Sequence, residues 1–559
     1  MTKPIELPDD YYHTNFCALV DFVALRYQSL LSFDEQAFYR AFKAVSLSAQ
    51  KLYIRLLTRK GDYFRAEKLN YPELEPYCEC AAELAGAGLL AINPERSLEL
   101  KMALLTKVEL LQRSGKSELK TLKRAELEAA LLAVEGPETD ELAQQLGAND
   151  TVYQVLLGQH FNTYKLCFFG NLRQDMSDYV LRDLGLLLYE DYPLSQDQLL
   201  FQTRAQIERH LQYYVALDQL DEALDSDAAF MLAAVATLPE IDTNDITLTR
   251  RVERCLLAVA RQLERIESLN EALELYQRCS RHPSRERQAR ILLKQGHVEP
   301  CLALCGAMIK APVTEEEEVF ARDFAFRTAR KHLSKAELSA WSVPKRSGPR
   351  TETVLLVPRD CSVERLVAEH LAPEGECFYA ENSLFNGVFG LYFWEVIFAP
   401  IKGAFFNPFQ VAPADFSSAN FTLSRAAMIQ DRMETLSAST LAACVWQQWQ
   451  AKQGRANPLV HWPELSEPLL TLALARIPIA HWRAVFMRLL NDIPHHRSGF
   501  PDLIHFPDEG AYELVEVKAP GDKLQKNQGR WMHYFSQHKI PHRVLHVKYS
   551  DETRSDATV

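Results

Sequence analysis

The chain has 559 residues, of which 47% are hydrophobic and 24% are charged, and this is the composition of a folded globular protein. At about 150 residues per domain, the length predicts roughly three to four domains. The net charge of −12 excludes a uniformly basic surface, although it leaves room for local basic patches.

The first 95 residues are predicted to be helical. Helical periodicity covers most of residues 15–345, with few β-branched runs. In AQKLYIRLLTRKGDYFRAEKLNY, basic and aromatic side chains interleave, a mixture that can contact phosphates and stacked bases. A solvated amphipathic helix explains the pattern equally well. We predict a helical DNA-binding region over 1–95, with candidate contacts at Lys51, Arg55, Arg59 and Lys60.

A second basic segment begins at Arg96. Between Arg96 and Arg124 there are eight Lys or Arg but only three Glu. The pattern KVELLQRSGKSELKTLKRAELEAALLA predicts two short helices around a turn at Gly115, and it resembles a SAP-type helical hairpin, a small module that binds the DNA backbone. Other basic helical hairpins give a similar pattern. We predict a SAP-like DNA-binding domain over 96–165, with candidate contacts at Lys116, Lys120, Lys123 and Arg124.

Residues 166–342 are predicted to form a helical repeat domain. ARQLERIESLNEALELYQRCSRHP is similar to one tetratricopeptide unit, with Ala272 and Tyr276 on its second helix and Pro283 closing it. A further helical pair follows at a shorter interval, so the repeats are irregular. In TEEEEVF, Thr314 is predicted to cap a solvated helix, because acidic residues favour a helix N-terminus. Such arrays usually serve as scaffolds.

VPKRSGPR is predicted to be a linker over 343–350, and after it the helical periodicity gives way to a mixed pattern of strands and helices. TETVLLVP predicts a strand, helices follow, and HRVLHVKYS predicts a closing strand. We therefore predict an α/β domain over 351–550. The last residues, 551–559, are predicted to be a flexible tail.

A hairpin near the end of this domain carries charges that do not suit a core. The predicted strands DLIHF and YELVEVK are joined by the turn-rich PDEG. Strand alternation places Leu514, Glu516 and Lys518 on one face. If the hairpin closes symmetrically, Asp502 lies opposite Glu516 and Lys518. Two carboxylates and an ammonium would then converge at one end of a small sheet.

This convergence has a chemical interpretation. Carboxylate oxygens are the ligands that Mg²⁺ and Mn²⁺ prefer, and a nearby lysine can orient water and stabilise charge on a phosphate. These are the elements of the PD-(D/E)xK nuclease pattern. Alone, the pattern is also explained by chance or by a surface salt bridge.

The flanking residues add further matches. GFPDL and LVEVKAPGDKLQKNQGRW resemble the signature of the VRR-NUC nuclease domain. Asp522 is predicted to cap a helix, with Gln525 three residues on. On that helix the polar Gln528 shares a stripe with core-like residues, so it should have a buried partner, either in an active site or on the backbone. Lys523 and Lys526 lie around the stripe and are candidate phosphate contacts.

The order of all these segments, together with YAENSLFNGVFGLYFWEVIF, resembles the Fanconi-associated nuclease family. The resemblance implies a multidomain protein: α-helical N-terminal and TPR-like regions, then an α/β PD-(D/E)xK domain of restriction-endonuclease-like fold. It implies a 5′-flap endonuclease and 5′-to-3′ exonuclease that acts on branched or 5′-flap double-stranded DNA in interstrand cross-link repair. Its cofactor would be Mg²⁺ or Mn²⁺, as one or two ions.

The resemblance also assigns roles to site residues. Asp502, Glu516 and Glu381 would bind the metal together with the Val517 carbonyl, and Lys518 would be catalytic; we add Gln528 as a catalytic candidate. Glu395 is a rival to Glu381, but fourteen helical residues span about 21 Å, so both cannot reach one metal cluster. The histidines around the hairpin lack metal-binding spacing.

Two other functions remain open from the sequence: a nuclease that resolves four-way junctions, and a DNA-binding scaffold without activity. No Cys/His cluster precedes residue 50, so ubiquitin binding through a zinc finger is not supported. The eleven scattered cysteines and the start MTKPIELPDDYYHTN favour a reducing compartment and no membrane association. We expect a cytoplasmic, nucleoid-associated protein in a prokaryote, or a nuclear protein in a eukaryote.

Overall fold

A computed structural model describes residues 10–74, 76–134, 137–147, 150–174, 187–195, 198–242, 244–341 and 348–550. The predicted tail 551–559 and most of the predicted linker 343–350 lie outside these residues. The described chain divides into two compact units, one formed by 1–186 with 201–211, and one formed by 187–200 with 212–559.

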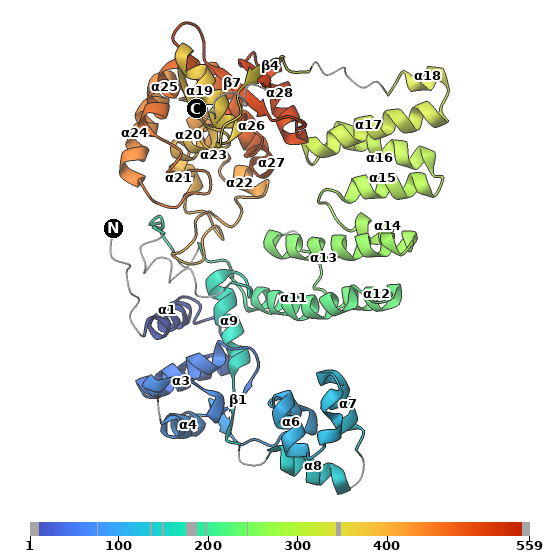
Figure 1. The fold of residues 1–559 in the computed structure, drawn as a ribbon, viewed down its shortest axis with the longest axis vertical. Coiled ribbons are helices and arrows are strands. Elements are labelled where there is room, and N and C mark those ends of the chain that lie inside the picture. The colour runs from blue at the N-terminus through green and yellow to red at the C-terminus, as the bar shows by residue number, and fades with distance from the viewer. Residues whose placement is uncertain are drawn as a thin grey trace, which may run out of the picture. The chain divides into compact units, whose positions relative to one another are not determined.

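The first unit combines helices with a small sheet (Figure 1). Its elements outside the basic segment are α1 (Tyr11–Arg26), α2 (Phe33–Ala44), α3 (Leu47–Leu57), β1 (Tyr63–Arg65), α4 (Tyr77–Gly86), β2 (Leu90–Ile92), β3 (Val152–Val155) and α9 (Gly158–Phe169). The strands pair antiparallel in the order β1-β3-β2. The helices confirm the helical prediction, but the sheet was not predicted.

The basic segment folds as a group of short helices, α5 (Leu98–Ala103), α6 (Lys107–Ser114), α7 (Arg124–Leu132) and α8 (Pro137–Gly147). Gly115 ends α6 with a φ of 68°, a left-handed conformation that glycine adopts without strain. A 3-10 turn over 117–121 separates α6 from α7, so the predicted hairpin is not a simple pair of helices. The buried Arg65 on β1 donates hydrogen bonds to Glu109 and Asp150, which ties this group to the small sheet.

The helical repeats follow as a succession of antiparallel pairs, and Figure 1 shows α13 to α17 stacked one after another. The helices are α11 (Arg204–Ala223), α12 (Ala228–Ala236), α13 (Ile246–Arg265), α14 (Leu269–Gln277), α15 (Ser284–Lys294), α16 (Val298–Lys310), α17 (Glu315–His332) and α18 (Lys335–Leu338). Ala272 and Tyr276 lie buried on α14, and Thr314 accepts the Glu317 N–H at the start of α17, both as predicted.

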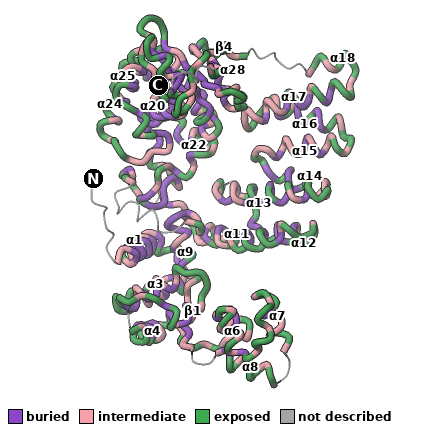
Figure 2. Tube along the Cα trace, viewed as in Figure 1, coloured by how far each residue is buried: buried purple, intermediate pink, exposed green. Residues whose placement is uncertain are grey.

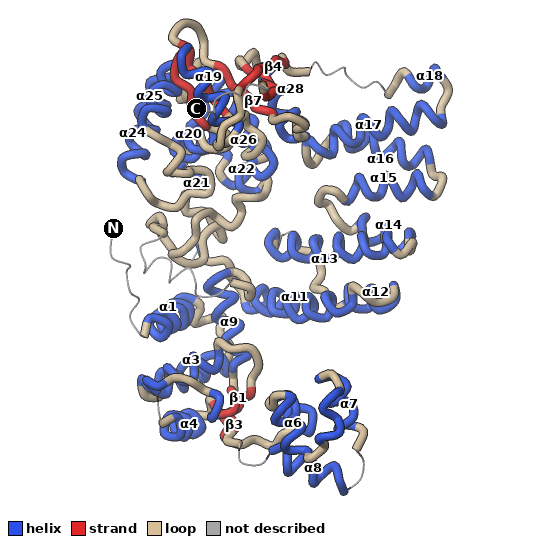
Figure 3. The backbone as a smooth tube through the Cα atoms, in the orientation of Figure 1, coloured by secondary structure: helices blue, strands red, loops and turns tan. Residues whose placement is uncertain are grey.

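The C-terminal part contains a five-stranded mixed sheet in the order β4-β8-β7-β6-β5, and the strands are red in Figure 3. Its strands are β4 (Thr351–Leu356), β5 (Gly375–Tyr379), β6 (Leu503–Pro507), β7 (Glu513–Lys518) and β8 (His542–Tyr549). β4 and β7 both run parallel to β8, whereas β5–β6 and β6–β7 are antiparallel. The predicted opening strand, hairpin and closing strand are therefore confirmed.

Helices enclose this sheet: α19 (Val363–Leu371), α20 (Leu384–Tyr392), α21 (Trp394–Ile397), α22 (Asn420–Ser424), α23 (Ala426–Glu434), α24 (Ala438–Lys452), α25 (Glu467–Arg476), α26 (Ile479–Asn491), α27 (Ile493–His496) and α28 (Lys526–Gln537). Alternation along β7 sends Leu514 into a large aromatic core on one face of the sheet and Val515 and Val517 into a smaller core on the other. Figure 2 shows buried residues gathered in this domain.

Three details of this part differ from the sequence predictions. The continuous helix expected between Glu381 and Glu395 begins only at Leu384 and is interrupted at Phe393, so α20 and α21 are separate. Gln525, not Asp522, is the N-cap residue of α28, and its backbone N–H donates to Gln528 Oε1. Residues 187–195, which fall within the predicted repeat domain, pack on the C-terminal part instead: Glu190 there accepts hydrogen bonds from Trp394 and Lys452.

No single described helix is long and apolar enough to cross a membrane. Only the pair α25 and α26, bent by 109°, passes that test by length and composition.

Candidate active site

The charged end of the hairpin forms as the sequence predicts. The register pairs Leu503 with Val515, which places Asp502, the residue before β6, opposite Glu516. The Asp502 Oδ2 atom accepts the Val517 N–H at 2.8 Å. The carboxylate that precedes one strand is thereby fixed to the strand that carries the second carboxylate.

Glu516 lies in an unusual environment for a carboxylate. Its side chain is 0% exposed. Lys518 Nζ lies 2.7 Å from Glu516 Oε1 as an ion pair. Among the described residues, however, neither Glu516 oxygen receives a hydrogen bond of good geometry. The Lys518 ammonium offsets part of this charge, but the buried Oε2 atom has no partner among the described residues, which is costly and suits an acceptor for a bound cation.

Burial and nearby carboxylates raise the pKa of both Asp502 and Glu516. Burial raises the pKa of Asp502 to about 6, against the opposing effects of the Val517 N–H and the Lys518 charge. Burial, followed by the charge of Asp502, raises the pKa of Glu516 to about 7. Glu381 raises the pKa of both groups, and Glu364 on α19 raises that of Asp502. Such a cluster favours a divalent cation, because the cation offsets the repulsion.

Lys518 is held on two sides. Its ammonium contacts Glu516 and donates a 3.1 Å hydrogen bond to Gln528 Oε1. Gln528 Oε1 also accepts the Gln525 N–H at 2.9 Å, which caps α28. Gln528 therefore bonds both to the backbone and to the Lys518 side chain. Its contacts orient Lys518.

Glu381 comes from the turn before α20, not from the helix itself. Its Oε2 atom accepts the Tyr379 hydroxyl at 2.5 Å, and its Oε1 atom accepts Asn382 Nδ2 at 2.8 Å. The rival Glu395 is 61% exposed at its side chain and forms an ion pair with Arg432 at 2.5 Å. Glu395 is therefore committed elsewhere, whereas Glu381 adjoins the pair of carboxylates.

The residues suit a metal that takes few protein ligands. Among the described residues, no three His, Cys, Asp or Glu side chains form a ready-made metal-binding group. Magnesium usually takes one or two carboxylates and completes its shell with water and substrate phosphate. Asp502 and Glu516, whose Oε2 atom has no partner among the described residues, fit that requirement.

The histidines near the hairpin have other partners. His495 contacts the Asp492 carboxylate, and His496 contacts the Arg488 carbonyl and Glu315. His533 contacts Gln537, and the ring of His538 lies 4.2 Å from that of Tyr534. These contacts place the rings in structural roles.

The candidate DNA contacts fall into two groups. Lys60, Lys120, Lys123, Lys523 and Lys526 are exposed and available to phosphates. Several others are engaged within the protein. Arg55 lies 3.8 Å from the centre of the Tyr12 ring, and Lys51 Nζ lies 3.8 Å from Asp10. Arg59 lies over the Phe64 ring, and Lys116 is half-buried.

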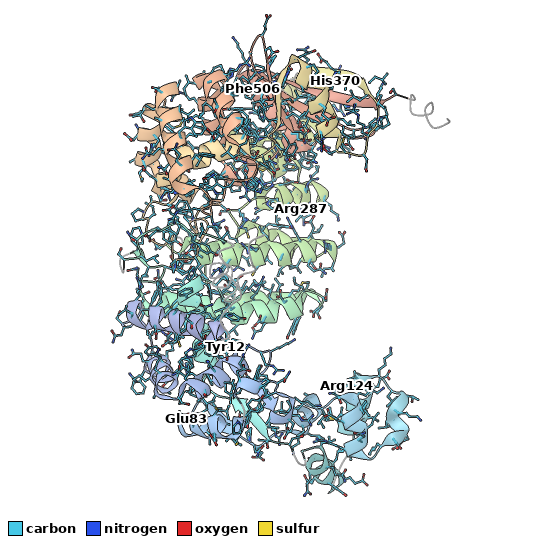
Figure 4. All side chains as sticks on the ribbon, turned by 60° about the vertical axis from the view of Figure 1, so that its left-hand side comes forward. Tyr12, Glu83, Arg124, Arg287, His370 and Phe506 are labelled. Carbon is cyan, nitrogen blue, oxygen red and sulfur yellow. The ribbon has the colours of Figure 1, made fainter. Side chains whose placement is uncertain are left out.

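Arg124, which Figure 4 labels, is engaged most closely. Its guanidinium donates to the carbonyls of Leu105 and Met102 at 2.6 and 2.8 Å and to Glu128 at 2.7 Å. Arg124 therefore joins α7 to the end of α5. These contacts indicate a structural role, because they use at least three of the five N–H donors of the guanidinium.

Sequence reasoning missed Tyr379, Asn382 and Glu364. Tyr379 and Asn382 flank Glu381 in the sequence, so adjacency to the chosen acid was the available signal. Glu364 approaches only through the packing of α19 on the sheet. No local pattern marks it.

Comparisons with known proteins agree with this geometry. The VRR-NUC domain family matches residues 437–549, and the FAN1 HTH domain family matches residues 10–91. The second match describes a helix-turn-helix where the sequence predicted only a helical DNA-binding region. A Fanconi-associated nuclease 1 homolog of Pseudomonas aeruginosa is 35% identical over 97% of each chain. A homolog of Arabidopsis thaliana is 23% identical over 93% of this chain and 65% of its own.

Two solved structures are similar over nearly the whole chain. The crystal structure of paFAN1 bound to 2nt 5′ flap DNA with gap covers 98% of this chain and 100% of its own, with 33% identity and a TM-score of 0.85. The structure of paFAN1 bound to 1nt 5′ flap DNA with gap covers the same shares, with 32% identity and a TM-score of 0.79.

Proposed function

The chain belongs to the Fanconi-associated nuclease family and is a structure-specific DNA nuclease, and we propose that it cleaves 5′-flap DNA with Mg²⁺ or Mn²⁺ at the site formed by Asp502, Glu516 and Lys518. Metal dependence is general for nucleases with this domain. One observation carries the assignment: the buried Glu516 carboxylate lies opposite Asp502, its Oε1 atom pairs with Lys518, and its Oε2 atom has no partner among the described residues.

We infer the following roles. Asp502 and Glu516 hold the metal ion, with Glu381 and the Val517 carbonyl as further ligands. The bound ion supplies Lewis acidity to the scissile phosphate. Lys518, kept in place by Gln528, orients the attacking water and offers positive charge to the phosphate oxygens. The Val517 N–H keeps Asp502 aimed at the site.

DNA binding would come mainly from surfaces outside this site. The exposed lysines Lys60, Lys120 and Lys123 lie in the first unit, whereas Lys523 and Lys526 adjoin the active site. Phosphate contacts of this kind position a duplex without reading its sequence. This suits an enzyme that selects DNA by shape.

The same family assignment supports the remaining proposals. We propose that the protein acts as a 5′-flap endonuclease and 5′-to-3′ exonuclease in interstrand cross-link repair, and that it works where the DNA is: in the nucleoid of a prokaryote or the nucleus of a eukaryote. The solved relatives on flap DNA do not favour a junction resolvase, and the complete carboxylate and lysine set does not favour an inactive scaffold.

A panel of end-labelled 5′-flap, 3′-flap and four-way-junction DNAs tests this proposal. With Mg²⁺ or Mn²⁺, the 5′ flap should be cut fastest, near the branch. Paired symmetric incisions in the four-way junction would favour a resolvase instead. Binding without cutting in either metal would favour a scaffold.

A further inference from the structure

Asn382 lies between two of the acidic groups of the candidate active site. The turn over 380–383 is closed by the Ser383 N–H on the Ala380 carbonyl, and it presents Glu381 and Asn382 side by side. Asn382 Nδ2 donates to Glu381 Oε1 at 2.8 Å. One end of the Asn382 amide therefore fixes the direction of the Glu381 carboxylate.

The other end of this amide reaches a distant segment. Asn382 Oδ1 accepts the Gly499 N–H at 2.9 Å and the Phe500 N–H at 3.3 Å. These residues lead directly to Asp502. Gly499 has a φ of +94°, and a Cβ there would lie 3.0 Å from the Asn527 backbone, so the path of this segment is narrowly defined.

Backbone contacts hold the same two segments together. The Asp502 carbonyl accepts the N–H groups of Ala380 and Glu381 at 2.9 and 3.1 Å. Asn386 Nδ2 donates to the carbonyls of Asn382 and Arg497 at 2.6 and 2.7 Å. The turn that carries Glu381 and the segment that leads to Asp502 are therefore joined by the Asp502 carbonyl and by the Asn386 side chain, in addition to the Asn382 side chain.

An amide suits this position for a chemical reason. It offers a donor to a carboxylate and an acceptor to backbone N–H groups at once. An aspartate would keep the acceptor but would place a like charge beside Glu381. Alanine would remove both functions and would leave two N–H groups without this acceptor.

We propose that Asn382 is a positioning residue that sets the Glu381 carboxylate relative to Asp502 and thereby raises the affinity of the site for its divalent cation. This inference rests on the proposed function, because it requires that Glu381 acts at the metal site. Groups that orient metal ligands typically contribute a factor of about 10 to 100 in metal affinity or activity. Asn382 acts through Glu381 and does not itself touch the DNA or the ion.

A double-mutant cycle with Glu381→Ala tests the proposal, with Mn²⁺ affinity measured by titration calorimetry on the full chain. Asn382→Ala should weaken Mn²⁺ binding by about 10-fold or more. In the Glu381→Ala background the same change should have an effect of less than about 3-fold, since the carboxylate that it orients is gone. An undiminished effect in that background would overturn the proposal, as would wild-type affinity in Asn382→Ala.

Asn382→Asp covers the case in which the alanine variant does not fold. It keeps the oxygen for Gly499 and Phe500, removes the donor toward Glu381 and adds a negative charge beside that residue. It should weaken Mn²⁺ binding despite its added negative charge, whereas tighter binding would contradict a positioning role. Asn270→Asp, at an exposed asparagine of the repeats that contacts Gln295, introduces the same charge and should leave Mn²⁺ binding unchanged.

Cleavage provides a second readout. Asn382→Ala should shift the Mg²⁺ concentration for half-maximal cutting of a 5′ flap upward, while saturating Mg²⁺ restores most of the rate. A lower rate with an unchanged Mg²⁺ midpoint would overturn the proposal. If the wild type binds Mn²⁺ but cuts no flap, the proposed function fails, and the calorimetric cycle still decides the role of Asn382.

Discussion

Asp502 accepts a 2.8 Å hydrogen bond from the backbone N–H of Val517, one residue beyond Glu516. This bond fixes the half-buried Asp502 carboxyl group opposite the buried Glu516 carboxyl group, although burial and the charge of Asp502 raise the pKa of Glu516. The hairpin tolerates this repulsion in the same way that many active sites keep destabilising groups for function.

Removal of one carboxylate should stabilise the protein when metal is withheld. The folded pKa of Glu516, about 7, exceeds the ordinary 4.5. The folded state therefore holds its proton more tightly, so stability falls as pH rises from about 4.5 to 7. At pH 8 in EDTA, Glu516→Gln should raise the melting temperature of the nuclease domain. The substitution should also abolish the further increase in melting temperature that Mn²⁺ produces in the wild type.

Glu434→Gln provides the matched control for this experiment, because Glu434 is an exposed carboxylate of the same domain. Its melting temperature should follow the wild type with and without Mn²⁺. A Glu516→Gln variant that is less stable than the wild type in EDTA at pH 8 would mean that Glu516 is a favourable structural ion-pair partner.

Cleavage at limiting Mg²⁺ should increase with pH between about 6 and 7.5. Asp502 and Glu516, with pKa values of about 6 and about 7, must lose their protons to hold a cation. Saturating Mg²⁺ should move this rise to lower pH, because the cation competes with protons. Initial rates over pH 5.5–8.5 at two Mg²⁺ concentrations test this, and a pH-independent rate at limiting Mg²⁺ would refute it.

Lys518→Met should reduce cleavage by about 100-fold or more without a comparable loss of DNA affinity. Gln528→Leu should reduce it less, by about 10-fold, because the lysine remains but loses its 3.1 Å contact. Single-turnover cleavage and fluorescence-anisotropy binding separate the two effects. A parallel loss of binding and cutting in Lys518→Met would indicate that Lys518 acts mainly as a DNA-binding residue.

Arg124→Ala should lower stability more than DNA affinity. The change removes the Arg124 donor from the Leu105 carbonyl and leaves the Met102 carbonyl with backbone donors alone, and it should cost about 1–3 kcal/mol of unfolding free energy. Lys123→Ala, at the exposed neighbouring residue, should show the reverse: unchanged stability, and a salt dependence of DNA binding reduced by about one phosphate contact. Equal salt slopes for Lys123→Ala and the wild type would exclude Lys123 as a phosphate contact.

Glu315→Gln should weaken the packing of α17 against the nuclease domain. Glu315 accepts from Arg488 at 2.7 Å and contacts His496 at 3.2 Å. Burial opposes its ionisation, but His496 and Arg488 lower the pKa of Glu315 to about 2. Its contribution is thus present above about pH 4.5 and is lost as pH falls toward 2.

The buried Arg488, which lies over the rings of Trp531 and Tyr534, would lose its carboxylate partner in this variant. We expect a loss of about 2 kcal/mol at pH 7, measured by denaturant unfolding, and a smaller difference from the wild type at pH 3. Equal stability of the two proteins at pH 7 would contradict this.

The sequence was most informative where a side-chain period was fixed by burial. In the hairpin, side chains alternate between the two faces with a period of two residues, and a slip by one residue would bury the wrong face. This alternation determines the register and brings Asp502 opposite Glu516. The strands β1 and β2 have only three residues each, too few to show a period against a helical background, and they were missed.

Other errors came from tertiary contacts. The apolar run from Leu384 to Phe398 gives no sign of its break at Phe393, because residues on both sides are buried. Glu381 was identified by its matching stretch, but its partners Tyr379 and Asn382 depend on the turn that orients them. The sequence predicts Arg124 as a phosphate contact, but in the structure its guanidinium donates to nearby helix carbonyls, and no local pattern indicates these contacts.

The central claim is that Asp502 serves cleavage and not DNA binding, and Asp502→Ala compared with the wild type on one labelled 5′-flap DNA in Mg²⁺ or Mn²⁺ tests it most directly. We predict that the variant binds the flap with wild-type affinity and does not cut it in either metal. Cutting by Asp502→Ala at a rate close to that of the wild type would contradict the assignment of the active site.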